Sequence, residues 1–118
     1  VEDNLTNRQV IEVMLRKLGY RVSLYEDGKQ AVSAAEQGRL PALILMDIHM
    51  PVMDGLTATQ LIRERERNLS IARIPIVALT ADAFEKDRQL CMEIGMDDFL
   101  TKPVSIELLQ KTLKKWIA

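Results

Sequence analysis

The sequence between residues 42 and 55 reads ALILMDIHMPVMDG, and this stretch decides the fold. Its first half, residues 42–46, is an unbroken apolar run, which is typical of a parallel strand covered on both faces. The run ends in Asp47, and after a loop Asp54 offers a side chain that can cap a helix starting at Gly55. The stretch therefore predicts a buried strand, a loop and a helix.

The same kinds of element repeat on both sides of this stretch. Gly19, Gly38 and Gly95 each follow residues with helical apolar spacing, and a glycine there can end a helix in the left-handed conformation. We predict helices over residues 7–18, 28–37, 55–66 and 83–94, and a last helix after Ser105. Thr6 and Gln9 fit the pattern of a capping box for the first of these helices, and Asp27 can cap the second. We predict strands over residues 20–25, 42–46, 76–79 and 98–101. Strands that alternate with helices imply right-handed crossovers and a parallel sheet.

Composition excludes several classes of protein. The 118 residues suit one domain, residues 1–118, and the net charge of −1 gives no electrostatic reason to expect nucleic acid or an anionic membrane as a direct partner. Cys91 is the only cysteine, which excludes an intramolecular disulfide, suits a cytoplasmic location and predicts an inert core residue. No apolar run reaches transmembrane length.

Polar side chains end the predicted strands. Glu2 and Asp3 follow the first residue, Asp47 and Thr80 end the two buried apolar runs, and Lys102 follows the last strand. In parallel sheets of this kind the functional site lies at the carboxyl ends of the strands. We therefore expect these side chains to meet at one edge of the sheet.

The chemistry of such a cluster is restricted. Closely packed carboxylates repel one another, so at least one would keep its proton unless a cation were present. The natural cation is Mg²⁺, which prefers oxygen ligands and keeps several waters. A carboxylate flanked by Mg²⁺, a lysine and a hydroxyl can attack a phosphoryl group, because the positive charges neutralise the phosphoryl oxygens.

Taken together, these motifs resemble the receiver domain of two-component response regulators, and the resemblance covers the whole chain in order and spacing. The pieces that carry it are VEDN at 1–4, LMDIHMP at 45–51, MDG at 53–55, ALTA at 78–81 and KP at 102–103. The segment GMDDFLTKP at 95–103 resembles in particular the receivers fused to hybrid sensor histidine kinases.

The resemblance implies a flavodoxin-like (βα)5 fold, a doubly wound parallel sheet of five strands in the order 2-1-3-4-5. In this family several apolar residues precede the acidic pair, whereas here only Val1 does, so the first strand is truncated. Four missing buried aliphatic side chains would forfeit about 6–12 kcal/mol. We therefore expect residues upstream of Val1 to complete this strand in the natural protein.

The resemblance also implies the roles of the acidic residues. Asp47 is the phosphoacceptor and forms an acyl phosphate. Glu2, Asp3 and Asp47 bind Mg²⁺ together with the backbone carbonyl of His49. The side chain of His49 is expected to face solvent near the site.

Further roles follow from the same resemblance. Lys102 contacts the phosphoryl oxygens, Thr80 swings in to hydrogen-bond the phosphoryl group, and Phe99 is the switch aromatic that changes rotamer with Thr80. The bond between Lys102 and Pro103 is expected to be cis. The donor and recipient are a histidine kinase or a histidine phosphotransfer domain, and a homodimer is possible. The domain is a phosphoacceptor rather than a classical enzyme, and a histidine kinase parent anchored in the inner membrane would carry its activity elsewhere.

Other functions fit the residues less well. A phosphatase of the haloacid dehalogenase type needs a second aspartate two residues after the nucleophile, where this chain has His49. A nucleotide binder needs a glycine-rich phosphate loop of a kind that the sequence lacks. A degenerate receiver that only dimerises remains an alternative. The alternating charges at residues 63–67 predict a solvated helix end with weak local pairs.

Overall fold

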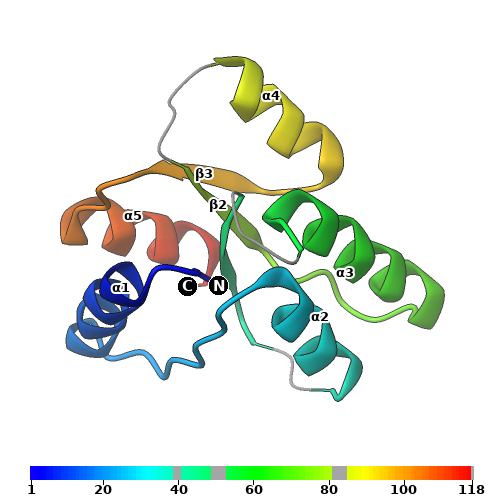
Figure 1. Ribbon diagram of the computed structural model, residues 1–118, viewed down its shortest axis with the longest axis horizontal. Helices are drawn as coiled ribbons and strands as arrows, with labels where there is room; N and C mark the ends of the chain where they lie inside the picture. The colour runs from blue at the N-terminus through cyan, green and yellow to red at the C-terminus, as the bar shows by residue number, and fades with distance from the viewer. Residues whose placement is uncertain (39–40, 49–52, 81–84, 118) are drawn as a thin grey trace.

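The computed structural model of the chain describes residues 1–38, 41–48, 53–80 and 85–117, in which five helices and three strands lie side by side (Figure 1). In chain order the elements are α1 Leu5–Lys17, α2 Gly28–Glu36, β1 Ile44–Asp47, α3 Gly55–Leu69, β2 Ile76–Thr80, α4 Glu85–Ile94, β3 Asp98–Thr101 and α5 Ile106–Trp116. Within these segments, no helix combines the length and the apolar character needed to cross a membrane.

The three strands form one parallel sheet in the order β1-β2-β3. Asp47 of β1 is in register with Leu79 of β2, and Thr80 of β2 is in register with Thr101 of β3. The carboxyl ends of all three strands therefore reach the same edge of the sheet. The α/β class and the parallel sheet predicted from the sequence are confirmed.

The number of strands differs from the expectation, because residues 20–25 form no strand and the sheet of the described residues has three strands instead of five. Val1 nevertheless lies beside β1: its amine donates to the Leu45 carbonyl (2.6 Å), and its carbonyl accepts from the Asp47 amide (3.0 Å). On the other side, the Glu2 amide donates to the Tyr25 carbonyl (3.0 Å). These residues thus occupy the place of the first strand in the expected order. Two residues are too few to build a ladder with the 20–25 segment.

The sheet is covered by helices on both faces, which explains the unbroken apolar runs of its strands. Ile76 and Ala78 pack in a cluster with residues of α2, α3 and α4, and Val77 and Leu79 pack in a cluster with α1 and α5. Figure 1 shows α1 and α5 on one side of the strands and α2 and α3 on the other. Cys91 is 1% exposed in the first cluster, as predicted for a core residue.

Capping side chains set the starts of four helices. Asp27, Asp54 and Ser105 each accept a hydrogen bond from the backbone amide three residues later, and the caps at Asp27 and Asp54 are those that the sequence predicts. The expected capping box of Thr6 is wrong. Asn4 caps α1 instead and accepts from the Asn7 amide, so that the helix begins directly after the acidic pair.

The charged run at residues 63–67 is also different from its prediction. Arg63 and Glu66 are buried, at 4% and 6% exposure, rather than solvated. The Arg63 guanidinium donates to Glu66 (2.7 Å), to Asp97 (2.7 Å), and to the carbonyls of Gly95 (2.8 Å) and Ile74 (2.8 Å). This network ties α3 to the segments that precede β2 and β3.

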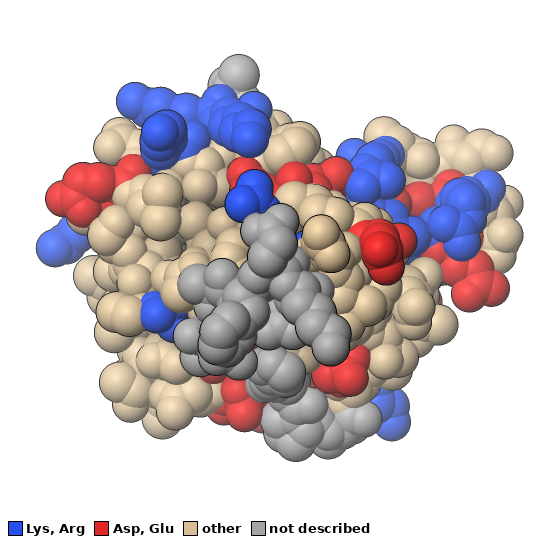
Figure 2. Space-filling view, turned by 90° about the horizontal axis from the view of Figure 1, so that it is seen from above, with Lys and Arg blue, Asp and Glu red and all other residues tan. Residues whose placement is uncertain are grey.

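Charges of both signs are interspersed on the one face of the molecule that Figure 2 shows. Figure 2 shows separate groups of basic side chains with acidic ones between them on the face seen from above. This distribution agrees with the near-zero net charge, and it gives that face no field of a single sign.

Candidate functional site

The candidate site lies at the carboxyl edge of the sheet, where the three strands end. Asp47 is the last residue of β1, Thr80 is the last of β2, and Lys102 directly follows β3. The amide of Lys102 donates to the Thr80 carbonyl at 2.7 Å, which extends the ladder by one residue and fixes the base of the lysine side chain. The parallel register therefore brings together three of the predicted site residues.

The acidic pair joins this edge from the N-terminus of the chain. One carboxylate oxygen from each of Glu2, Asp3 and Asp47 lies within 4.8 Å of the other two. Glu2 and Asp47 are buried, at 3% and 4% exposure, whereas Asp3 is exposed. All three carboxylates predicted from the sequence are thus in one cluster.

Lys102 provides positive charge to this cluster. Its Nζ donates to Asp47 Oδ2 at 2.8 Å and forms an ion pair with Glu2 Oε2 at 2.7 Å. Burial lowers the pKa of Lys102, but the hydrogen bonds and negative charges of Asp47 and Glu2 outweigh burial and raise the pKa above the usual 10.5. The ammonium is therefore charged throughout the neutral range.

Two glycines allow the chain after Asp47 to turn closely against its neighbours. The Gly55 amide donates to the Ile48 carbonyl (3.3 Å), and a Cβ on Gly55 would collide with the Asp47 carbonyl oxygen. The Gly28 amide donates to the Met53 carbonyl (3.1 Å), and a Cβ on Gly28 would lie only 2.6 Å from that oxygen. The starts of α2 and α3 therefore fix both ends of the loop that follows β1.

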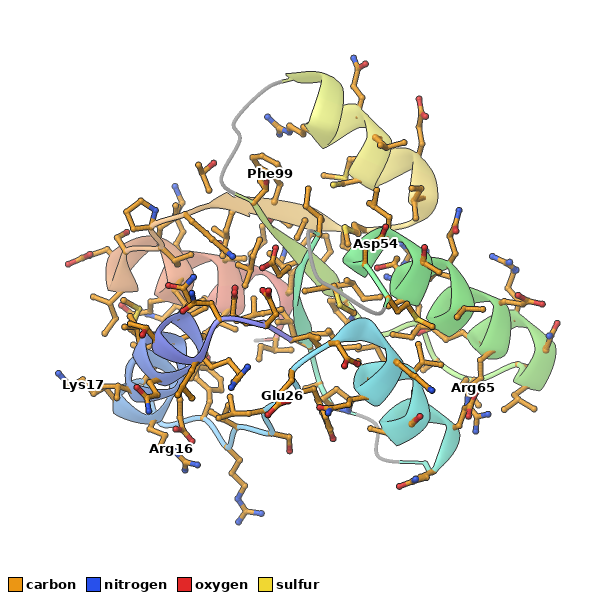
Figure 3. All side chains as sticks on the ribbon, viewed as in Figure 1. Arg16, Lys17, Glu26, Asp54, Arg65 and Phe99 are labelled. Carbon is orange, nitrogen blue, oxygen red and sulfur yellow. The ribbon has the colours of Figure 1, made fainter. Side chains whose placement is uncertain are left out.

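The two predicted switch residues occupy neighbouring strands. Thr80 is fully buried, at 0% exposure, and Phe99 is half-buried. Phe99 is in register with Ala78 and packs against the cluster between the sheet and α2, α3 and α4. Figure 3 shows its ring on the side of β3 that faces α4. The predicted cis bond between Lys102 and Pro103 is confirmed, and His49 lies outside the described residues.

Arg8 is a residue of the site that sequence reasoning missed. Its Nη1 donates to the backbone carbonyls of Glu2 (2.9 Å) and Asp3 (3.0 Å). The signal for it was present, because a cation near the start of a helix is disfavoured by the helix dipole and calls for another explanation.

The donor set fits a hard divalent cation. Three carboxylates and one ammonium leave an excess of negative charge in a partly buried site. Mg²⁺ is held in proteins by a few carboxylate or carbonyl oxygens and retains several waters, and the exposure of Asp3 leaves one side of the cluster open to solvent. Glu2, Asp3 and Asp47 are thus the described residues that could hold such an ion.

Comparisons with known proteins agree with this geometry. The sequence model of the response regulator receiver domain family matches residues 1–114 of the chain. The chain is 44% identical over 118 residues to hybrid signal transduction histidine kinase M of Dictyostelium discoideum and 40% identical over 116 residues to the sensor protein GacS of Pseudomonas syringae pv. syringae. These alignments cover 99% and 98% of the chain but only 5% and 13% of those two proteins.

Solved receiver structures superimpose on most of the chain. The receiver domain of the sensor histidine kinase PA1611 from Pseudomonas aeruginosa PAO1, described with a magnesium ion coordinated in its active-site cleft, is 51% identical with a TM-score of 0.87, covering 99% of this chain and 93% of that one. The Ssk1 receiver of Saccharomyces cerevisiae, solved with the histidine phosphotransfer protein Ypd1, is 34% identical with a TM-score of 0.91, covering 98% and 83%. The flavodoxin-like fold expected from the sequence is thereby confirmed. The chain belongs to the response regulator receiver domain family of two-component signalling systems.

Proposed function

We propose that Asp47 accepts a phosphoryl group from a phosphohistidine in a transfer that depends on Mg²⁺. The observation that carries the proposal is the position of Lys102, whose Nζ lies 2.8 Å from Asp47 and 2.7 Å from Glu2 at the carboxyl edge of a parallel sheet. A lysine held there is placed to neutralise the oxygens of a phosphoryl group that reaches Asp47.

The proposed step moves the phosphoryl group from a histidine nitrogen to a carboxylate oxygen. One carboxylate oxygen of Asp47 attacks phosphorus, the phosphorus–nitrogen bond of the phosphohistidine breaks, and its electron pair returns to the imidazole. An acyl phosphate remains on Asp47, and Lys102 offsets the charge on its oxygens. Glu2, Asp3 and Asp47 would hold Mg²⁺, together with the backbone carbonyl that the family resemblance implies for His49, and the bound ion would add further charge neutralisation.

The acyl phosphate would then act on a switch formed by Thr80 and Phe99. Phosphorylation adds about −1.5 to −2 charges. The hydroxyl of Thr80, at the end of the adjacent strand, would donate a hydrogen bond to the phosphoryl oxygens. Movement of Thr80 frees room for Phe99 to change rotamer. The result is a shift between two populations of the face formed by α4, β3 and α5.

The partners proposed for this site are a histidine kinase and a histidine phosphotransfer domain, within a hybrid sensor histidine kinase as parent. The similarity to two hybrid or sensor kinases supports this parent. A yeast receiver in complex with a phosphotransfer protein supports the partner. We place the domain in the cytoplasm, with the parent anchored in the inner membrane.

Intact mass spectrometry after incubation with acetyl phosphate tests the proposal. We expect one added phosphoryl group on the unchanged chain with Mg²⁺, none without Mg²⁺, and none on Asp47→Asn. The matched control is Asp27→Asn, because asparagine also caps a helix and the residue lies at the start of α2. It should accept the phosphoryl group as the unchanged chain does. A folded chain that gains no mass would contradict the proposal and favour a degenerate receiver that acts by dimerisation.

A further inference from the structure

We infer that Arg8 is a positioning residue that holds Glu2 and Asp3 in the geometry required to bind a divalent cation. The inference rests on the cation site of the proposed function, and it adds a residue outside that ligand set. Arg8 lies in the first turns of α1, and its side chain is only 13% exposed.

The contacts of Arg8 are directed at the backbone of the acidic pair. A single nitrogen, Nη1, donates to the carbonyl of Glu2 at 2.9 Å and to that of Asp3 at 3.0 Å. The second nitrogen, Nη2, lies 3.9 Å from the exposed carboxylate of Glu26, whose side chain Figure 3 shows between α1 and α2. One guanidinium nitrogen therefore ties two successive peptide groups to each other and to the helix.

Neighbouring bonds hold the rest of this turn, and Arg8 is the partner of the Asp3 carbonyl within the described part of the chain. The Asn4 amide donates to Glu2 Oε1 at 3.2 Å, and the Glu2 amide donates to the Tyr25 carbonyl at 3.0 Å. The Asp3 side chain is exposed, so its direction depends on the orientation of its backbone. Removal of Arg8 should therefore affect Asp3 more than Glu2.

The charge of Arg8 would by itself have the opposite effect on cation binding. A positive charge near the carboxylates weakens their attraction for Mg²⁺, and a cation near the start of α1 opposes the helix dipole. If Arg8 acted only through its charge, its removal would tighten Mg²⁺ binding. If it acts by positioning, its removal weakens Mg²⁺ binding, so that the sign of the change separates the two roles.

The test is an NMR titration of the isotope-labelled chain with MgCl₂ alone, which measures the Mg²⁺ dissociation constant without any phosphodonor. We expect the dissociation constant of Arg8→Met to rise about 10-fold or more, as for other residues that orient metal ligands. Arg8→Lys should also bind more weakly, because lysine keeps the charge but carries it on a flexible stem whose N–H groups have no fixed direction. The matched control is Arg16→Met, since Arg16 pairs only with Glu12 on the exposed surface of the same helix among the contacts described.

Urea unfolding of each variant separates positioning from loss of structure. A merely structural role would lower the urea midpoint and leave the dissociation constant of the folded protein unchanged, and Arg8→Lys decides the matter if Arg8→Met does not fold. An unchanged or lower dissociation constant in folded Arg8 variants would overturn the inference while leaving the proposed function intact. If the unchanged chain itself shows no saturable shift with Mg²⁺, the proposed cation site fails and the inference fails with it.

Discussion

Replacement of Arg63 by methionine should destabilise the fold through a buried charge that loses its partner. Glu66 is 6% exposed, and its Oε1 lies 2.7 Å from Arg63 Nη1. Its other oxygen accepts from the Ile74 amide at 2.7 Å, which does not neutralise the charge. Asp97 also loses a bond to Arg63 but keeps an ion pair with Arg73 at 2.8 Å. The main cost therefore comes from Glu66.

The expected magnitude is large for one substitution. Removal of one partner of a buried ion pair costs about 3–5 kcal/mol, because the remaining charge is uncompensated. Since Asp97 retains Arg73, we expect a value near the lower end, about 3 kcal/mol. This is a large fraction of the stability of an ordinary domain, about 5–15 kcal/mol.

Urea denaturation followed by far-UV circular dichroism measures this loss by linear extrapolation. The matched control is Arg67→Met on the exposed side of the same helix, which should change the free energy of unfolding by less than about 0.5 kcal/mol. Glu66→Gln in the Arg63→Met background should recover part of the loss, because a neutral amide costs less to bury. A loss below about 1 kcal/mol in Arg63→Met would refute the reasoning, because a solvent-exposed ion pair contributes a stabilisation of that size.

Two further predictions concern the site. Gly55→Ala should lower the free energy of unfolding by about 1–3 kcal/mol, because the new Cβ would collide with the Asp47 carbonyl, and unchanged urea stability would contradict this. The raised pKa of Lys102 predicts how the stability difference between the unchanged chain and Lys102→Met varies with pH. The difference in free energy of unfolding should be constant from pH 8 up to 10.5, the ordinary lysine pKa. It should shrink as the pH rises further, through the higher pKa of the folded state. A difference that already shrinks below pH 10.5, measured by urea unfolding, would show that the carboxylates do not stabilise the ammonium.

Much of the fold could be read from the sequence because burial and capping are local signals. The strand predicted over 98–101 coincides with β3, and Asp27, Asp54 and Ser105 cap the predicted helices. The strand predicted over 20–25 was wrong because apolar alternation reports burial but not the presence of a partner. Among the described residues, Val1 and Glu2 lie at this edge, and one backbone bond, from the Glu2 amide, reaches Tyr25.

The site was predictable to the extent that it depends on strand ends. The parallel order of the strands brings Asp47, Thr80 and Lys102 to one edge of the sheet, regardless of the conformation of the loops. The role of Arg63 was missed for a different reason: the alternating charges suggested solvent, whereas helical spacing puts residues 62, 63 and 66 among the buried positions of α3. A charge pattern alone does not reveal which side of a helix is covered.

The contact between Lys102 and Asp47 joins residues 55 positions apart, and the same ammonium reaches Glu2 near the other end of the chain. Such distant pairings carry the entropic cost of closing long loops, so they depend on the fold that brings the strand ends together. The proposed acceptor chemistry is consequently a property of the finished tertiary structure and of no shorter segment. A nascent, partly unfolded or proteolytically nicked chain would lack the assembled site. Signalling through this domain would therefore be confined to fully folded molecules.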